Sequence, residues 1–98
     1  MVKKIANNDM TEVLAEKVAL VDFSATWCGP CQMLAPLAEE LEGQVAVYNV
    51  DVDANSDLAM QYRVMSVPSL LLFKDGQVAG QTVGYQSADE IKAFIANN

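Results

Sequence analysis

Histidine is absent from this sequence of 98 residues, and cysteine occurs only twice. A closed structural zinc site needs four ligands, which a chain with a single cysteine pair and no histidine does not offer. A metal or cluster shared between two copies of the chain is the alternative that this count leaves open. For the single chain we predict no metal site.

Basic residues are also scarce, since six Lys and Arg stand against thirteen Asp and Glu and give a formal net charge of −7. Nucleic acids and anionic membranes both attract basic surfaces. We therefore predict that neither nucleic acid nor a membrane is a partner. The acidic excess mainly keeps such a protein soluble.

The sequence has no long hydrophobic run. Lys3 and Lys4 could begin a signal peptide, but residues 5–9 supply no apolar core after them. No stretch approaches the roughly 20 apolar residues that cross a bilayer as a helix. These absences lead us to expect a cytoplasmic protein, and in that compartment a cysteine pair is more often catalytic than structural.

Apolar residues, by contrast, are plentiful: 52% of the chain is hydrophobic and only 19% is charged. This composition is typical of a folded domain and not of a disordered chain. The length is that of one small domain. We therefore predict a single domain over residues 1–98.

Both cysteines lie in the stretch Trp27-Cys28-Gly29-Pro30-Cys31. Their spacing lets the sulfurs reach disulfide distance when the second cysteine lies in the first turn of a helix. Pro30 suits an early helical position, and the unpaired N–H groups there favour a thiolate. The pair can therefore cycle between dithiol and disulfide. A static structural bridge is the alternative, but so short a loop constrains little of the unfolded chain.

The spacing of apolar residues predicts alternating strands and helices. Strands are expected at about 2–5, 18–23, 45–52, 69–74 and 77–84, and helices at about 9–16, 30–42, 55–62 and 88–96. A buried strand, a helix and a second strand predict parallel pairing, whereas Asp75-Gly76 predicts an antiparallel hairpin. The predicted fold class is α/β in the order βαβαβαββα, with a mixed sheet flanked by helices on both faces.

Several residues predict where the helices begin, end and bend. The expected caps are Asn8 or Asp9, Gly43, Asn55 or Ser56, and Ser87 with Glu90. The first helix should bury Met10, Val13 and Leu14 on one face. Pro36 lies inside the second helix and should kink it.

Asp22 is the exception in an otherwise apolar strand. Burial raises the pKa of a carboxyl group unless hydrogen bonds or a cation compensate. The residue can act as a functional proton acceptor or can lie at a solvated strand end, and the strand pattern leaves both open.

Taken in order, these features resemble the thioredoxin family along essentially the whole chain. The matching residues are Asp22-Phe23, the motif from Trp27 to Cys31, Pro36, Asp51-Val52-Asp53, Val67-Pro68, Leu70 to Gly76, and Val83-Gly84. The resemblance implies the thioredoxin fold and the reduction of protein disulfides, with no bound cofactor. It also implies a thioredoxin reductase as partner, which passes electrons from NADPH, and we expect the chain to be a monomer.

The resemblance implies a role for three residues in catalysis. Cys28 would be the nucleophile, exposed at the helix start, and would form a mixed disulfide with the substrate. Cys31, more buried, would attack the Cys28 sulfur and release the reduced substrate. Asp22 would be the base that takes the Cys31 proton, through a water.

A flat apolar surface for the substrate is implied around Cys28. A cis bond before Pro68 would turn the Val67 backbone toward the sulfurs, where it can pair with an extended substrate segment. The expected surface consists of Trp27, Gly29, Pro30, Val67, Pro68 and Gly84, with Tyr85 beside it. Trp27 and Tyr85 could instead be core residues, and Met65 could lie at the rim or in the core.

Two residues depart from the family pattern. Ser24 stands where many members have a second tryptophan, and Asn49 stands where many carry a lysine beside the buried aspartate. Because that cation would favour the ionised form of Asp22, we predict a higher Asp22 pKa here than in members with the lysine. The resemblance also implies that a Gly-Pro dipeptide between the cysteines, with no histidine, belongs to a reductant and not to a strong oxidant.

Two other functions stay open at this point. Within the enzyme class, the chain could be a dedicated thiol donor to one partner or an isomerase-like member. Outside it, the chain could be a thioredoxin-fold binding or scaffold module with incidental redox activity. The intact cysteine pair favours the enzyme, and Cys28→Ser separates the classes because it would abolish only a reductase.

Overall fold

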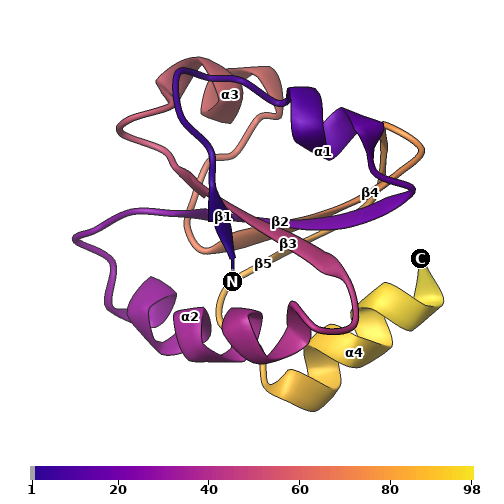
Figure 1. The fold of residues 1–98 in the computed structure, drawn as a ribbon. Coiled ribbons are helices and arrows are strands. Elements are labelled where there is room, and N and C mark those ends of the chain that lie inside the picture. Colours follow the sequence, from indigo (N-terminus) through magenta and orange to yellow (C-terminus); the bar gives the residue numbers. More distant parts are fainter. Residues whose placement is uncertain (1) are drawn as a thin grey trace.

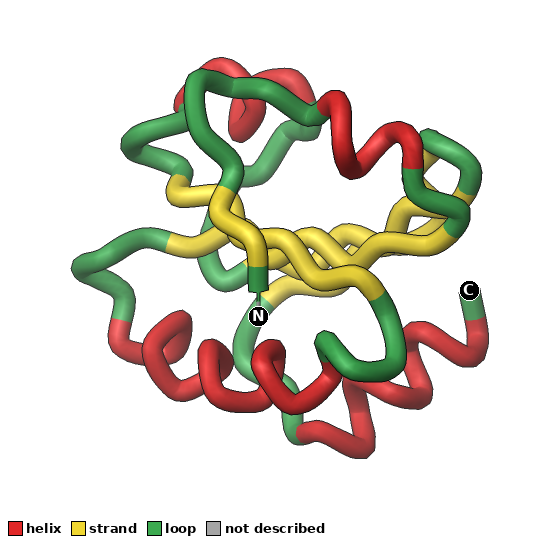
Figure 2. The backbone as a smooth tube through the Cα atoms, in the orientation of Figure 1, coloured by secondary structure: helices red, strands yellow, loops and turns green. Residues whose placement is uncertain are grey.

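The computed structural model describes residues 2–98 and folds them into a five-stranded sheet with helices on both faces (Figure 1). The elements are β1 (Lys3–Lys4), α1 (Thr11–Ala15), β2 (Val18–Ser24), α2 (Gly29–Leu41), β3 (Ala46–Asp51), α3 (Ser56–Gln61), β4 (Ser69–Lys74), β5 (Gln77–Val83) and α4 (Ala88–Asn97). Helices α1 and α3 cover one face, and α2 and α4 cover the other (Figure 2). The predicted element order and α/β class are confirmed.

Strand β2 is central in the sheet order β1-β3-β2-β4-β5. It pairs in parallel with β3 and antiparallel with β4, so the sheet is mixed as predicted. Because side chains alternate between faces along a strand, Val21 and Phe23 point to one helical layer and Leu20 and Asp22 to the other. The register places Asn49 of β3 directly beside Asp22.

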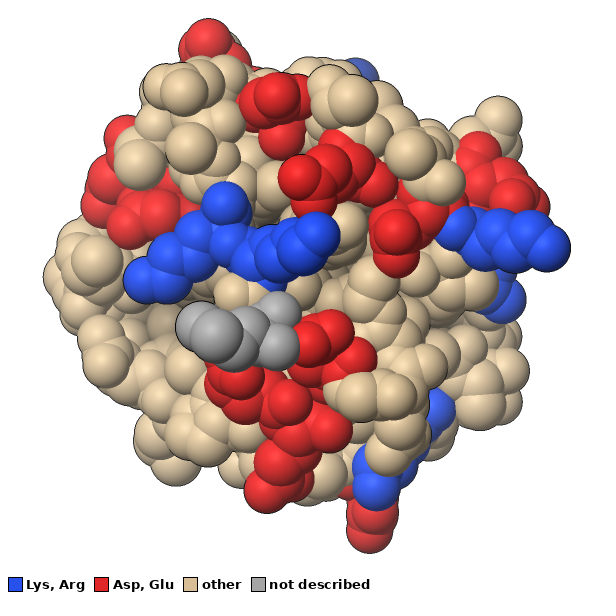
Figure 3. Space-filling model, in the orientation of Figure 1, with Lys and Arg blue, Asp and Glu red and all other residues tan. Residues whose placement is uncertain are grey.

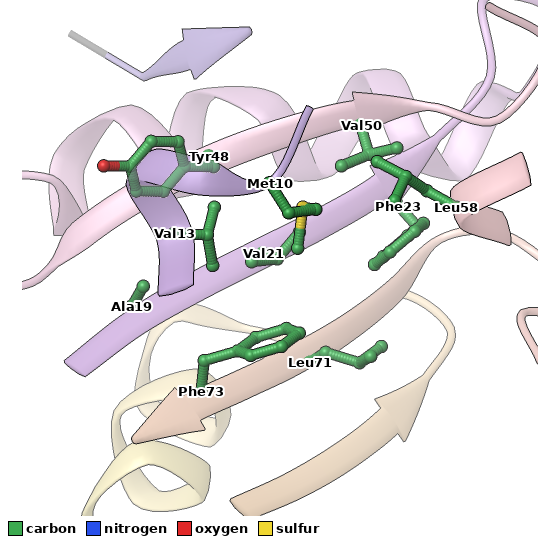
Figure 4. Packing of buried hydrophobic residues seen from close by; sticks show 10 residues of the cluster. All are labelled: Met10, Val13, Ala19, Val21, Phe23, Tyr48, Val50, Leu58, Leu71 and Phe73. Carbon is green, nitrogen blue, oxygen red and sulfur yellow. The ribbon is translucent and has the colours of Figure 1, made fainter. Parts of the chain in front are cut away.

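Two apolar clusters hold the helices against the sheet. The first fills the space under α1 and α3 (Figure 4) and contains Met10, Val13, Ala19, Val21, Phe23, Tyr48, Val50, Leu58, Leu71 and Phe73. The second lies under α2 and α4 and contains Leu20, Leu34, Ala38, Leu41, Val47, Leu70, Leu72 and Ile91. Burying apolar area on both faces fixes the position of the β2 end and hence of the cysteine motif.

The turn between β4 and β5 has the geometry that its sequence predicts. Asp75 has φ 50° and Gly76 has φ 81°, the two positive values that a two-residue hairpin turn of type I′ requires. The pairing shifts between Leu72 and Phe73, which leaves an irregularity next to Gly80 in β5. The capping box of Ser87 and Glu90 at α4 is also confirmed.

The predicted caps of the first two helices are wrong. Met10 is the N-cap of α1, and Asp9 instead accepts hydrogen bonds from the backbone and hydroxyl of Thr11. Helix α2 has Glu42 as its C-cap, with right-handed backbone angles, so the conformational freedom of Gly43 is not used there.

Two further details of the helices differ from expectation. Leu14 is 45% exposed, although it was expected to be buried. Helix α1 has only five residues, and Val13 is the one that it buries. Asn55 is the N-cap of α3, but its side chain does not cap the helix; Asn8 accepts the Leu58 N–H instead. Helix α2 continues through Pro36, and the kink there stays a prediction.

Candidate active site

The cysteine motif begins just after the end of β2, where a short loop leads into α2. Cys28 is the N-cap of the helix and forms a disulfide with Cys31, with the two Cα atoms 5.3 Å apart. The backbone N–H of Cys31 donates to the Cys28 Sγ at 3.2 Å. A helix N-terminus that directs a donor at this sulfur favours the thiolate once the disulfide is reduced.

Both cysteines are buried in this state, with 6% of Cys28 and 4% of Cys31 exposed. The expectation that Cys28 is exposed is therefore wrong for the oxidised chain, because the disulfide packs against Ala25 and the partly buried side chain of Val67. The Cys28 Sγ lies 3.7 Å from the Val67 carbonyl oxygen. A group that approaches this sulfur therefore meets the Val67 backbone.

The segment after α3 supplies that backbone. The Val67–Pro68 peptide is cis, as the resemblance implies. The Gly84 N–H donates to the Pro68 carbonyl oxygen at 2.7 Å, and Gly84 itself has φ 96°. This hydrogen bond ties the end of β5 to the segment that faces Cys28.

Three large apolar side chains that sequence reasoning considered for the substrate surface are exposed to solvent. Trp27 is 72% exposed, Tyr85 is 46% exposed and Met65 is 92% exposed, so the core alternative is wrong for all three. The indole Nε1 of Trp27 donates to the Asp53 carboxylate at 2.9 Å, which fixes the ring orientation. Sequence reasoning assigned Asp53 no role at the site. Its position just after β3 was the available signal. Because β2 and β3 are parallel, the residues after β3 lie at the same edge of the sheet as the loop after β2.

Asp22 lies inside β2 and is 3% exposed, so the solvated strand end is wrong. Its Oδ1 has no hydrogen-bond partner among the described residues. Burial raises the Asp22 pKa from the ordinary value of 3.8 to about 6, and the neighbouring Asn49 amide lowers it in part. The Asn49 amide donates its two hydrogen bonds to the Asp22 backbone carbonyl and to the Ser24 hydroxyl. It therefore acts on the Asp22 carboxyl as a nearby dipole.

A pocket of about 430 Å³ brings Asp22 and Cys31 together. It lies on the α2 side of the sheet, and its other polar walls include Ser24 and Asn49. The carboxyl group and the resolving cysteine, nine residues apart in sequence, therefore line the same pocket. A carboxyl group that titrates near neutral pH beside a buried cysteine can exchange a proton with it.

This arrangement agrees with the comparison to known proteins. The thioredoxin family model matches residues 1–97. The chain belongs to the thioredoxin family. Thioredoxin of Staphylococcus aureus, in strain Mu50 and in strain MW2, is 44% identical over 96 residues, which is 94% of this chain and 92% of the relative. A solved mutant thioredoxin of Halobacterium salinarum NRC-1 is 42% identical with a TM-score of 0.86, over 97% of this chain and 89% of that one.

Family membership and the cysteine pair together define the activity. The chain is a thiol-disulfide oxidoreductase, a protein-disulfide reductase of the thioredoxin type, and Cys28 and Cys31 are its redox-active centre. Thioredoxins need no bound cofactor, and residues 2–98 contain no group of three or more His, Cys, Asp or Glu that could hold a metal ion. Within the same residues, no helix has both the length and the apolar character to cross a membrane. No observation favours the scaffold alternative.

Proposed function

We propose that the chain is a general, monomeric reductant of protein disulfides in the cytoplasm, reduced in turn by a flavin-dependent thioredoxin reductase that draws on NADPH. One observation supports this most directly: the Cys28 sulfur lies at the start of α2 and faces the Val67 carbonyl oxygen. A reactive sulfur beside an open backbone segment suits disulfides held in extended chain of varied sequence. Acidic groups are more extensive than basic groups on the face drawn in Figure 3, in keeping with a soluble carrier.

The first step is attack by the Cys28 thiolate on one sulfur of the substrate disulfide. The substrate S–S bond breaks, a mixed disulfide forms, and the released substrate thiolate takes a proton from solvent. The Cys31 N–H that donates to the Cys28 Sγ stabilises the attacking thiolate.

The second step resolves the mixed disulfide. The Cys31 thiol gives its proton to the Asp22 carboxylate through a water, and its sulfur attacks the Cys28 sulfur. The mixed S–S bond breaks, and the second substrate thiolate leaves and is protonated. The substrate gains two electrons and two protons, and the chain is left with the disulfide of Cys28 and Cys31.

The substrate lies on the surface around the cysteines. Trp27, Gly29, Pro30 and Gly84 form its wall, and the backbone of Val67 pairs with the substrate chain. Pro68 supports that segment from beneath, since its carbonyl oxygen already accepts the Gly84 N–H. The hydrogen bond from Trp27 to Asp53 keeps the large apolar ring in place at the edge of this surface.

Reduction of insulin disulfides with dithiothreitol as the electron source tests the proposal. Rapid turnover by the parent, with loss to the uncatalysed rate in Cys28→Ser and Cys31→Ser, is the expected result. Equal rates in all three proteins would contradict the dithiol mechanism. Replacing dithiothreitol with NADPH and a thioredoxin reductase tests the electron route, which fails if only dithiothreitol supports turnover.

Breadth of substrate is tested separately. Rates with several unrelated disulfide proteins should fall within about a factor of ten of one another for a general reductant, because the contacts of an extended backbone do not depend on sequence. A single strongly preferred substrate would support the dedicated donor.

A further inference from the structure

Three polar side chains lie in one row across the sheet on the α2 side. Strand register pairs Lys4 of β1 with Asn49 of β3, and Asn49 with Asp22 of β2. All three line the pocket that contains Cys31. Adjacent strands are about 4.8 Å apart, so the backbones of Lys4 and Asp22 are separated by two strand spacings. Asn49 occupies the strand between them.

Asn49 is held in place by two hydrogen bonds to β2. Its Nδ2 donates to the Ser24 hydroxyl at 2.8 Å and to the Asp22 carbonyl oxygen at 3.3 Å. Ser24 and Asp22 point to the same face of the strand because they are two residues apart. The hydroxyl therefore fixes the amide against the same stretch of β2 that presents the carboxyl to the pocket.

We propose that Asn49, oriented by Ser24, is a positioning residue for Asp22 in the disulfide reaction. Its amide dipole keeps the buried carboxyl able to ionise in a wall where no cation of residues 2–98 forms an ion pair with it. The inference rests on the proposed role of Asp22 as the base for Cys31, and it adds the two neutral side chains that prepare this base.

The charged groups around the pocket are consistent with this role. Lys4 comes from β1, Glu39 from α2 and Asp51 from β3, and each lines the same pocket. The Glu39 carboxylate accepts a hydrogen bond from the Val2 N–H at 3.2 Å, which joins β1 to α2 beside the pocket. The contact on the β4 side of Asp22 is the apolar Leu70. Asn49 is thus the polar neighbour of Asp22 on the adjacent strands. Its replacement by an apolar residue should therefore change the titration midpoint of the Asp22 carboxyl.

Asn49→Leu is the principal test, with Gln81→Leu on the exposed edge strand as the matched control. The Asp22 carboxyl is titrated by NMR in protein labelled with ¹³C at Asp, in the oxidised state. We expect its midpoint to rise by about half a pH unit or more in Asn49→Leu and to stay unchanged in Gln81→Leu. The same shift should appear in the pH dependence of resolution, followed in single turnovers through the fluorescence of Trp27, the one tryptophan.

A second pair of variants keeps the test independent of how well Asn49→Leu folds. Ser24→Val and Ser24→Thr have the same shape, and only threonine keeps the hydroxyl that accepts from Asn49. We expect Ser24→Val to shift the Asp22 midpoint in the same direction as Asn49→Leu, and Ser24→Thr to match the parent. Lys4→Gln, two strands away, should shift it less than Asn49→Leu does.

The outcomes separate this inference from the proposed function. If Asp22→Asn changes the pH dependence of resolution while Asn49→Leu and Ser24→Val both titrate like the parent, the positioning role is overturned and Asp22 remains the base. If Asp22→Asn leaves that pH dependence unchanged, the proposed base is wrong and the inference falls with it. A larger shift in Lys4→Gln than in Asn49→Leu would assign the effect to the lysine.

Discussion

The protein buries two polar side chains in very different ways. Asn55, at the start of α3, is fully buried, and its Nδ2 donates to the carbonyl oxygens of Ile5 and Asp51. Its Oδ1 accepts the backbone N–H of Asn8 at 2.9 Å. Both donors and the acceptor are used, and this amide joins the segment of Ile5 and Asn8 to the distant segment that begins at Asp51.

Asp22 is buried almost as deeply, yet its Oδ1 has no partner among the described residues. An unpaired buried carboxyl oxygen costs stability, whereas a paired amide contributes to it. The contrast shows how function can be recognised in a core: Asn55 is explained completely by the fold, and Asp22 is explained only by the chemistry of the adjacent cysteine. Substitutions at the two sites should therefore have opposite effects.

The largest effect is expected for Asn55→Leu. Three partly buried backbone groups would each lose a hydrogen bond, and we expect the free energy of unfolding to fall by about 4 kcal/mol. Insulin reduction per folded molecule should stay at the parent rate. Urea unfolding measures the loss, and Gln44→Leu on the surface should change stability by less than about 0.5 kcal/mol. A loss below about 1 kcal/mol in Asn55→Leu would remove the contrast with Asp22.

Asp22→Asn should stabilise the protein, and increasingly so as the pH rises. The folded-state pKa of about 6 lies above the ordinary 3.8, so the folded chain binds this proton more tightly than the unfolded chain does. The parent therefore loses stability as the pH rises from about 3.8 through about 6, on the order of 3 kcal/mol in total. Denaturation of both proteins across this range should show the difference growing with pH, and a difference independent of pH would contradict the raised pKa.

The same substitution should slow resolution of the mixed disulfide. Above neutral pH the parent carboxylate accepts the Cys31 proton, so we expect Asp22→Asn to be about tenfold slower or more there. Below about pH 5 the parent carboxyl is protonated, and the two rates should converge. Glu40→Gln removes an exposed carboxylate from α2, the helix of Cys31; it is the control and should keep the parent profile. Parallel profiles for parent and Asp22→Asn would exclude Asp22 as the base.

The smallest effect is expected at Asn8, which supports the Asn55 site from outside. Its Oδ1 accepts the Leu58 N–H in the first turn of α3, a capping bond supplied from another segment. Asn8→Ala should cost about 1 kcal/mol, typical of a lost cap. In a double-mutant cycle with Asn55→Leu, the double variant should lose less stability than the sum of the two single losses. The reason is that the Asn8 N–H donates to Asn55 and the Asn8 side chain accepts from Leu58, in the same part of the fold. Full additivity would show that the two residues act independently.

Local patterns in the sequence were enough to predict much of this protein. The spacing of apolar residues predicted each strand and helix to within a few residues, because burial of one face depends on periodicity alone. Asp75-Gly76 and the Ser87–Glu90 box were equally secure, since each depends on contacts within four residues. The redox role of Cys28 and Cys31 followed from their spacing and from the family pattern.

Tertiary structure decided what the sequence pattern could not. The pairing of Asn49 with Ser24 depends on strand register, and the bond from Trp27 to Asp53 joins residues 26 apart. The Asn55 site joins residues 5–8 to the start of α3. Gly43 and Leu14 show the converse, because a good local signal was overruled by where the helices end against the sheet. Sequence therefore determined which residues can do the chemistry, whereas long-range packing determined how far each is desolvated and which groups it meets, and those two quantities set reactivity.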